Sequence, residues 1–303
     1  MSEASGNIRF YKPSGSFSPV GVVLTLIVGA VVMVPAAIVY CLATRHIPIV
    51  YANFIVTYIF GAIAGMVVVF GAKRFGIRNV AVAGAMGGVL FLVGYAAHWP
   101  AYVSVLLCDW DEEPFNIALI AQTAMELAEN PDVLLELVRE IMEEGTWSLG
   151  KGSNSVVRGM MLGGVWVAEA ILILVAAVSI PVKKVRSPYS EKKGEWIKEE
   201  KMETPISYIE NTDAFMNAMA RHDYASLTTP MPTAADDPAQ KGFARVSLYP
   251  DDRETYVSVT NVQVKRNKKG KEKGTEEKKV VQFMAVDNAT AADIRAKLAG
   301  VAA

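Results

Sequence analysis

Four long apolar blocks, nearly free of charged side chains, constrain the fold of this chain more than any other feature of its sequence. They run from about residue 19 to 43, 50 to 72, 80 to 99 and 159 to 182. A helix needs roughly 20 apolar residues to cross the hydrocarbon core of a bilayer, and each block is long enough. Because lipid offers the backbone no hydrogen-bond partners, a spanning segment of this kind must be helical. The sequence therefore predicts an all-α bundle of four transmembrane helices, at residues 19–99 and 159–182.

Short flanks that carry Lys and Arg predict how these helices are oriented. Such residues precede the first block, lie between the second and third, and follow the fourth: Arg9 and Lys12, then Lys73, Arg74 and Arg78, then Lys183, Lys184 and Arg186. With four crossings these flanks fall on one side, which the positive-inside rule makes cytoplasmic. The first apolar run exceeds a signal-peptide core, which predicts a retained helix. We therefore expect a multi-pass protein of the cell membrane, of the bacterial inner-membrane type, with cytoplasmic residues 1–18 and a cytoplasmic C-terminus.

Residues 100–158 are predicted to form a small helical cap on the extracytoplasmic side. Three basic and eleven acidic side chains give this segment a net charge of −8. Trp99-Pro100 is typical of an interfacial helix end, so the third helix is expected to stop there. Apolar residues then recur with a helical period from Phe115 to Glu129 and again from Pro131 to Gly145. Pro131 suits the first turn of the second of these helices.

After the fourth block the composition becomes polar and predicts a cytoplasmic α+β region. Residues 183–241 are rich in charge and Pro, and are expected to form a linker with one short helix at 212–221. Residues 242–303 are expected to form a β-rich domain, with strands at 243–248, 255–265 and 280–286 and a closing helix from Thr290. The charged stretch 266–279 is expected to be a mobile hairpin tip.

Glu169 is the main candidate functional residue, because it lies inside the fourth apolar block. A carboxylate at that depth is expensive unless it is paired or protonated, so it should face the bundle interior. One hypothesis is a proton or cation site. The other is an interhelical hydrogen bond that fixes packing, which we favour because no second charge lies within the apolar blocks.

Possible partners of Glu169 are the polar residues in the outer halves of the other helices. They are Tyr40 in the first helix, Asn53 and Thr57 in the second, and Tyr95 and His98 in the third. Asn53 and Thr57 share a helix face, since they are four residues apart. His98 lies one residue before the predicted helix end and is interpreted as an interfacial side chain.

Two further groups were weighed as sites. The acidic residues Asp109, Asp111, Glu112 and Glu113 are a weak candidate for Ca²⁺, because they lack the glycine and the terminal glutamate of an EF-hand loop. We interpret them as a solvated loop, so no metal site is expected. Cys41 and Cys108 are both placed on the outer side, where a disulfide is possible, although sequence does not give their separation.

The sequence contains no signature of a catalytic site. It has no phosphate-binding loop of the Walker type, no dinucleotide fingerprint, no HExxH and no CxxC, and its three histidines are dispersed. We therefore expect a non-enzymatic protein without a cofactor. The small charge excess of residues 183–303, 21 basic against 18 acidic side chains, does not predict nucleic-acid binding. The expected function is a structural subunit that links both sides of the membrane within an assembly of membrane or cytoplasmic proteins. The alternative is a small transporter or ion-conducting protein that uses Glu169.

Overall fold

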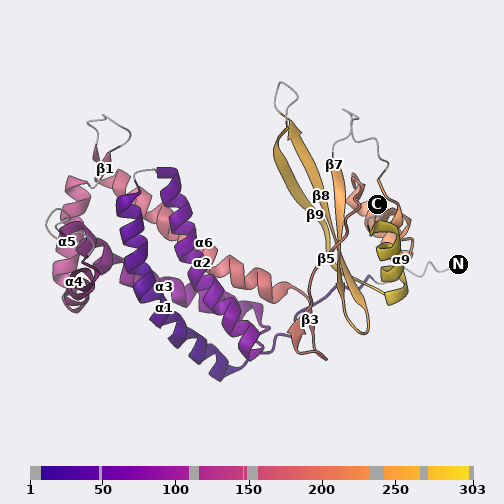
Figure 1. Ribbon diagram of the computed structural model, residues 1–303, viewed down its shortest axis with the longest axis horizontal. Helices are drawn as coiled ribbons and strands as arrows, with labels where there is room; N and C mark the ends of the chain where they lie inside the picture. Colours follow the sequence, from indigo (N-terminus) through magenta and orange to yellow (C-terminus); the bar gives the residue numbers. More distant parts are fainter. Residues whose placement is uncertain are drawn as a thin grey trace. The chain divides into compact units, whose positions relative to one another are not determined.

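A computed structural model describes residues 8–47, 50–108, 116–145, 147–148, 156–231, 242–266 and 272–299. The chain divides into two units, one formed by Ser14–Arg186 and the other by Met1–Pro13 together with Ser187–Ala303. The first unit holds the long helices, and the second is an α+β fold around one antiparallel sheet (Figure 1).

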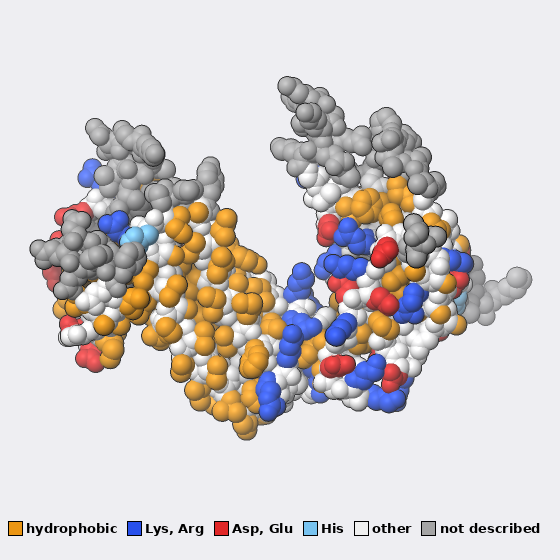
Figure 2. Space-filling model, viewed as in Figure 1, with side chains coloured by type: hydrophobic (Ala, Val, Ile, Leu, Met, Phe, Trp, Pro, Cys, Tyr) orange, Lys and Arg blue, Asp and Glu red, His pale blue; other side chains and the backbone are white. Residues whose placement is uncertain are grey.

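The first unit is built on four long helices. They are α1 (Pro19–His46), α2 (Val50–Phe75), α3 (Val80–Leu107) and α6 (Met160–Arg186), and each is long and apolar enough to cross a membrane. Large apolar side chains point outward along them: Val31 is 70% exposed and Phe70 is 68% exposed. Figure 2 shows hydrophobic side chains covering the visible face of these helices. Because so much exposed apolar surface suits lipid rather than water, the chain is a multi-pass membrane protein, as the sequence predicts.

Small residues let α2 and α6 approach each other closely. A Cβ atom at Gly61 would meet the Ile173 backbone, and one at Gly65 would lie 3.0 Å from Cβ of Ile180. The contacts advance in the same direction along both helices, so α2 and α6 run parallel. This is the internal packing that small residues four apart permit in membrane helices.

The flanks that carry Lys and Arg lie at one end of the bundle. Gly21, at the start of α1, packs against Phe75, at the end of α2. The backbone N–H of Arg78 donates to the Ser16 carbonyl at 2.7 Å. Since α6 runs parallel to α2, its basic C-terminal turn lies at this same end. The arrangement matches the predicted grouping of basic flanks on one side.

The predicted end of the third helix at Trp99 is wrong, because α3 continues through Pro100 to Leu107. The residues after Pro100 are mostly apolar, and Val103 and Val105 are fully buried. Proline is tolerated inside a membrane helix when neighbouring groups satisfy the freed backbone, and Pro35 and Pro181 lie inside α1 and α6 in the same way. The segment beyond the third helix therefore begins about two helical turns later than residue 100.

Two shorter helices follow, as the sequence predicts. They are α4 (Ile117–Glu129) and α5 (Pro131–Glu144), and the side chain of Asn116 caps the first by accepting from the N–H of Leu119 at 3.0 Å. Pro131 occupies the first turn of α5. A two-strand pair, β1 (Trp147–Ser148) and β2 (Val156–Val157), leads into α6. The apolar faces of α4 and α5 pack toward α3, where Ile120 is buried.

The second unit is built on an antiparallel sheet. Its long strands are β7 (Gly242–Pro250), β8 (Thr255–Arg266) and β9 (Glu272–Val286), and two short strands, β5 (Glu200–Lys201) and β6 (Ile206–Ser207), pair with the outer side of β7. Helices α7 (Thr212–Ala220), α8 (Ala225–Thr228) and α9 (Asn288–Leu298) contribute to the same buried core. Leu248, Val257 and Ile294 are fully buried within it.

This sheet differs from the prediction in two places. Strands β5 and β6 and helix α7 lie within the predicted linker, yet they pack on the sheet. Between β6 and α7, the backbone of Ile209 is held by Asn261 of β8, which accepts from its N–H and donates to its carbonyl. The described part of the predicted tip, from residue 272 onward, belongs to β9. Lys265 and Glu276 form an ion pair across the two strands at 2.7 Å, so alternating charges are compatible with pairing there.

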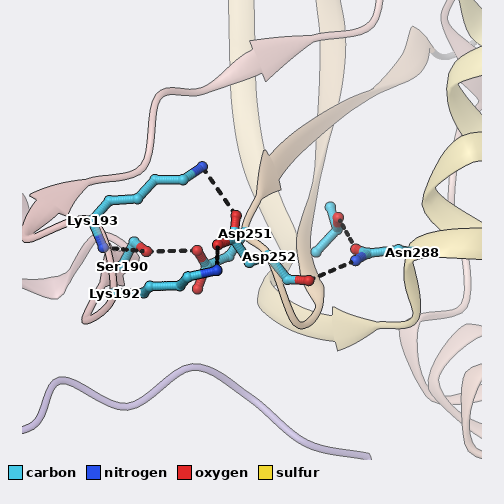
Figure 3. Close-up of polar contacts among 7 residues, drawn as sticks. Ser190, Lys192, Lys193, Asp251, Asp252 and Asn288 are labelled. Carbon is cyan, nitrogen blue, oxygen red and sulfur yellow. Dashed lines mark hydrogen bonds and ion pairs between the residues drawn. The ribbon is translucent and has the colours of Figure 1, made fainter.

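A short hairpin directly after α6 is held on the end of the sheet. Strands β3 (Tyr189–Ser190) and β4 (Glu195–Trp196) form it, and Figure 3 shows its polar contacts with the turn between β7 and β8. Ser190 donates to Asp251 at 2.6 Å, and Lys192 lies 2.7 Å from Asp252. The two lysines of the hairpin lower the pKa of Asp252 by hydrogen bonding and by their charge. The predicted linker is therefore ordered from its first residues.

The N-terminal segment belongs to this second unit as well. The N–H of Tyr11 donates to the Phe283 carbonyl at 2.9 Å, and the N–H of Ala285 donates to the Arg9 carbonyl at 2.8 Å. Tyr11 also packs edge-on against Tyr256, with ring centroids 5.3 Å apart. Residues 9–11 therefore pair with β9 and belong to the same folded unit as the C-terminal sheet.

Candidate functional site

Side chains from all four long helices meet in a polar cluster inside the bundle. The hydroxyl groups of Tyr40 in α1 and Thr57 in α2 are hydrogen-bonded at 3.1 Å. The Tyr40 ring lies 5.3 Å from the His98 ring of α3, and Trp166, which lies three residues before Glu169 in α6, packs against Trp99 of α3 with centroids 5.0 Å apart. The residues that the sequence selected therefore converge, although they are far apart along the chain.

Glu169 is the tenth of the 27 residues of α6 and is partly buried. It makes no hydrogen bond or ion pair with the residues that the structure describes. A carboxyl group inside a membrane helix is costly unless it is protonated or paired with a cation. The arrangement can therefore hold a proton or a cation.

His98 is buried within the helix bundle. It is only 5% exposed and lies nine residues before the end of α3. Because α3 continues past the predicted end at Trp99, His98 lies within the helix and not at its end. Its imidazole is a second ionisable group within the cluster, in addition to the carboxyl of Glu169.

Two buried polar atoms of the cluster lack hydrogen-bond partners within the described residues. They are Nδ1 of His98 and Oδ1 of Asn53. Asn53 takes part in the cluster through its backbone carbonyl, which accepts from the Thr57 hydroxyl at 2.8 Å. A buried polar atom without a partner costs roughly 1–3 kcal/mol, so these two atoms together lower the stability of the bundle.

A group of aromatic rings borders the cluster and was not predicted. Trp99 and Trp166 pack edge to face with centroids 5.0 Å apart, and Tyr95 and Tyr102 flank them. The sequence contains a signal for this group, because Trp166 lies three residues before Glu169 and the aromatic residues of α3 recur at a helical spacing. It was missed because residues beyond Trp99 were assigned to the cap.

The possible disulfide between Cys41 and Cys108 is not formed, since both are free thiols. The Cys41 thiol contacts the carbonyl of His98 at 3.7 Å. Cys108 lies ten residues further along α3, about 15 Å at the rise of an α-helix. A disulfide requires Cα atoms less than about 7 Å apart, so the two cannot pair without large movement.

The acidic candidates for a metal, Asp109, Asp111, Glu112 and Glu113, lie outside the described residues. Within the described ranges no group of three or more His, Cys, Asp or Glu side chains is arranged to hold a metal ion. No family model, curated protein or solved structure matches this chain.

Proposed function

We propose that this chain is a non-enzymatic integral membrane subunit, a structural component of a membrane protein assembly. The observation that carries the proposal is the double attachment of its soluble unit. The chain passes between the soluble unit and the bundle twice, at Pro13–Ser14 and at Arg186–Ser187. On one connection residues 9–11 are paired into the sheet, and on the other the β3–β4 hairpin is ion-paired to it. Such anchoring suits a protein that presents a folded surface to partners at the membrane.

The proposed orientation puts the soluble unit in the cytoplasm and α4 and α5 outside. The gathering of the basic flanks at one end of the bundle supports this orientation, as does the acidic character of the cap segment. The proposed location is the cell membrane, of the bacterial inner-membrane type. Partners are expected among other membrane or cytoplasmic proteins, and nucleic acid is not expected among them.

Isolation of the protein at its natural expression level tests this proposal. A chain with a C-terminal tag would be extracted in two unrelated detergents, and the native mass and polypeptide composition of the particle measured. We expect the same additional polypeptides in a fixed ratio in both detergents. A particle that contains only this chain in both detergents would contradict the proposal.

A second candidate function is supported by the cluster around Glu169. Within the described residues, a carboxyl without a hydrogen bond, a buried imidazole whose Nδ1 has no partner and an unpartnered Oδ1 of Asn53 are typical of a site that carries a proton or a cation. In this case the chain is a small transporter or ion-conducting protein. Substitution of Glu169 separates the two candidates, because only this one requires the carboxyl group.

A further inference from the structure

A cavity of about 240 Å³ lies within the soluble unit. Its walls come from four stretches that are distant in sequence: the N-terminal segment, the turn after α7, the turn between β7 and β8, and the end of β9. The floor is apolar and includes Met219, Met284 and Val286, which are all buried. The mouth is polar, with Arg9, His222, Tyr224, Arg253, Glu254 and Asp287.

Both acidic side chains at the mouth are fully engaged. The carboxylate of Glu254 accepts from Arg9 at 2.6 Å through one oxygen and from the Tyr256 hydroxyl at 3.0 Å through the other. The carboxylate of Asp287 caps α9, accepting from the N–H of Thr290 at 2.7 Å and from its hydroxyl at 2.9 Å. These hydrogen bonds lower the pKa of Asp287, so it remains ionised and committed to the cap.

The groups still available at the mouth are donors. Arg253 makes no hydrogen bond or ion pair within the described part of the chain. Nδ1 of His222 and the hydroxyl of Tyr224 contact each other at 3.2 Å, which leaves Nε2 of the imidazole available. Burial, and then the charge of Asp287, raise the pKa of the Tyr224 phenol, so it stays protonated as a donor. The hydrogen-bonded His222–Tyr224 pair leaves a donor free, either Nε2–H or the phenol O–H, depending on the tautomer. This donor beside a guanidinium selects an anion, and Arg binds carboxylates in a bidentate manner.

Backbone strain also concentrates around this cavity. Among the described residues, His222 and Phe283 are the non-glycine residues with positive φ, at 58° and 55°. His222 lines the cavity, and Phe283 directly precedes the lining residue Met284. His222 follows the last residues of α7, a position where glycine is common because it adopts this conformation without strain. Strain of this kind clusters at ligand sites.

We propose that this cavity binds a small carboxylate with an apolar body. The carboxylate group lies at Arg253 and the His222–Tyr224 pair, and the body covers Met219, Met284 and Val286. A water molecule occupies roughly 30 Å³ of liquid, so a ligand of about eight to ten non-hydrogen atoms fits the volume.

Calorimetric titration of the full-length protein in detergent tests this site with three probes. Benzoate has the required size and charge, benzylamine has the same shape and the opposite charge, and inorganic phosphate is an anion without an apolar body. We expect benzoate to bind and the other two not to bind. Failure of benzoate to bind, or equal binding of benzylamine, would overturn the proposal.

Two variants of lining residues and one control variant locate the binding and separate it from partition into micelles. Arg253→Ala should weaken benzoate binding by about tenfold or more, as expected for the loss of a charge-assisted hydrogen bond. Arg245→Ala removes an exposed arginine of the same unit that is paired with Glu277 outside the cavity, and should bind as the parent does. His222→Gly should keep or raise the thermal stability, because glycine relieves the strain, yet weaken benzoate binding. If His222→Gly or Arg253→Ala binds benzoate with unchanged affinity, the assignment of that side chain to the ligand is wrong.

Discussion

Gly61→Ala should destabilise the helix bundle strongly, although alanine is the better helix former. The new Cβ atom would lie 2.8 Å from Cα of Ile173 and against its carbonyl oxygen, both backbone atoms of α6 that have no rotamer to change. Helices α2 and α6 must therefore move apart. Overpacking of this kind costs typically about 1–3 kcal/mol, and occasionally more. Thermal unfolding in detergent, followed by size-exclusion chromatography of the heated samples, measures the loss.

Neighbouring glycines of α3 provide the matched control. A Cβ atom at Gly87 would meet the Ala177 carbonyl of α6, whereas one at Gly88 has nothing within 4 Å. Gly87→Ala should therefore destabilise the bundle as Gly61→Ala does. Gly88→Ala should be as stable as the parent, or slightly more stable because alanine has the higher helix propensity. Equal unfolding temperatures for all three variants would show that the bundle is not packed as described.

Removing the carboxyl group of Glu169 should raise the stability of the protein. Since this carboxyl has no hydrogen-bond partner within the described residues, Glu169→Gln and Glu169→Leu lose no contact and relieve a large cost of burial. Insertion scales place an acidic residue about 3 kcal/mol above leucine at the centre of a membrane helix, which sets the upper range for the leucine variant. Ala168→Gln is the control, because it adds a polar group on the exposed face one residue away and should lower stability.

The same variants decide between the two candidate functions. If the chain is a structural subunit, the Glu169→Gln variant should copurify with the same partner polypeptides in the same ratio as the parent. If the chain is a transporter or ion-conducting protein, the parent should carry a proton or cation flux in liposomes. Glu169→Gln should then abolish this flux while the fold remains intact. A Glu169→Leu variant that unfolds at a clearly lower temperature than the parent would contradict the absence of compensating contacts around this residue.

The long helices were predictable because their signal is local. A block of apolar residues crosses lipid wherever its neighbours lie, and capping residues such as Asn116 act within one turn. The end of α3 was not predictable, because proline at residue 100 has two outcomes that depend on tertiary surroundings. A lone proline usually ends or kinks a helix in water. Here the helix continues past Pro100, and its residues Val103 and Val105 are buried by packing.

The candidate site was predictable in its members and not in its geometry. Glu169, Tyr95 and Thr57 are conspicuous because polar groups are expensive inside apolar helices. Which of them meet depends on helix rotation and crossing, and these are set by contacts such as Gly61 against Ile173. The pairing of residues 9–11 with β9 joins positions more than 270 apart in sequence, and no local sequence pattern predicts it.

Orientation across the membrane is the claim on which this account depends most, and labelling of single cysteines tests it directly. Both native cysteines would be replaced by alanine. Two single-cysteine variants would then be made, Glu136→Cys on the exposed face of α5 and Thr275→Cys on the exposed face of β9. A membrane-impermeant maleimide would then be applied to intact and to permeabilised cells. We expect Glu136→Cys to be labelled in intact cells and Thr275→Cys only after permeabilisation. Labelling of Thr275→Cys in intact cells, with Glu136→Cys protected until permeabilisation, would contradict this orientation.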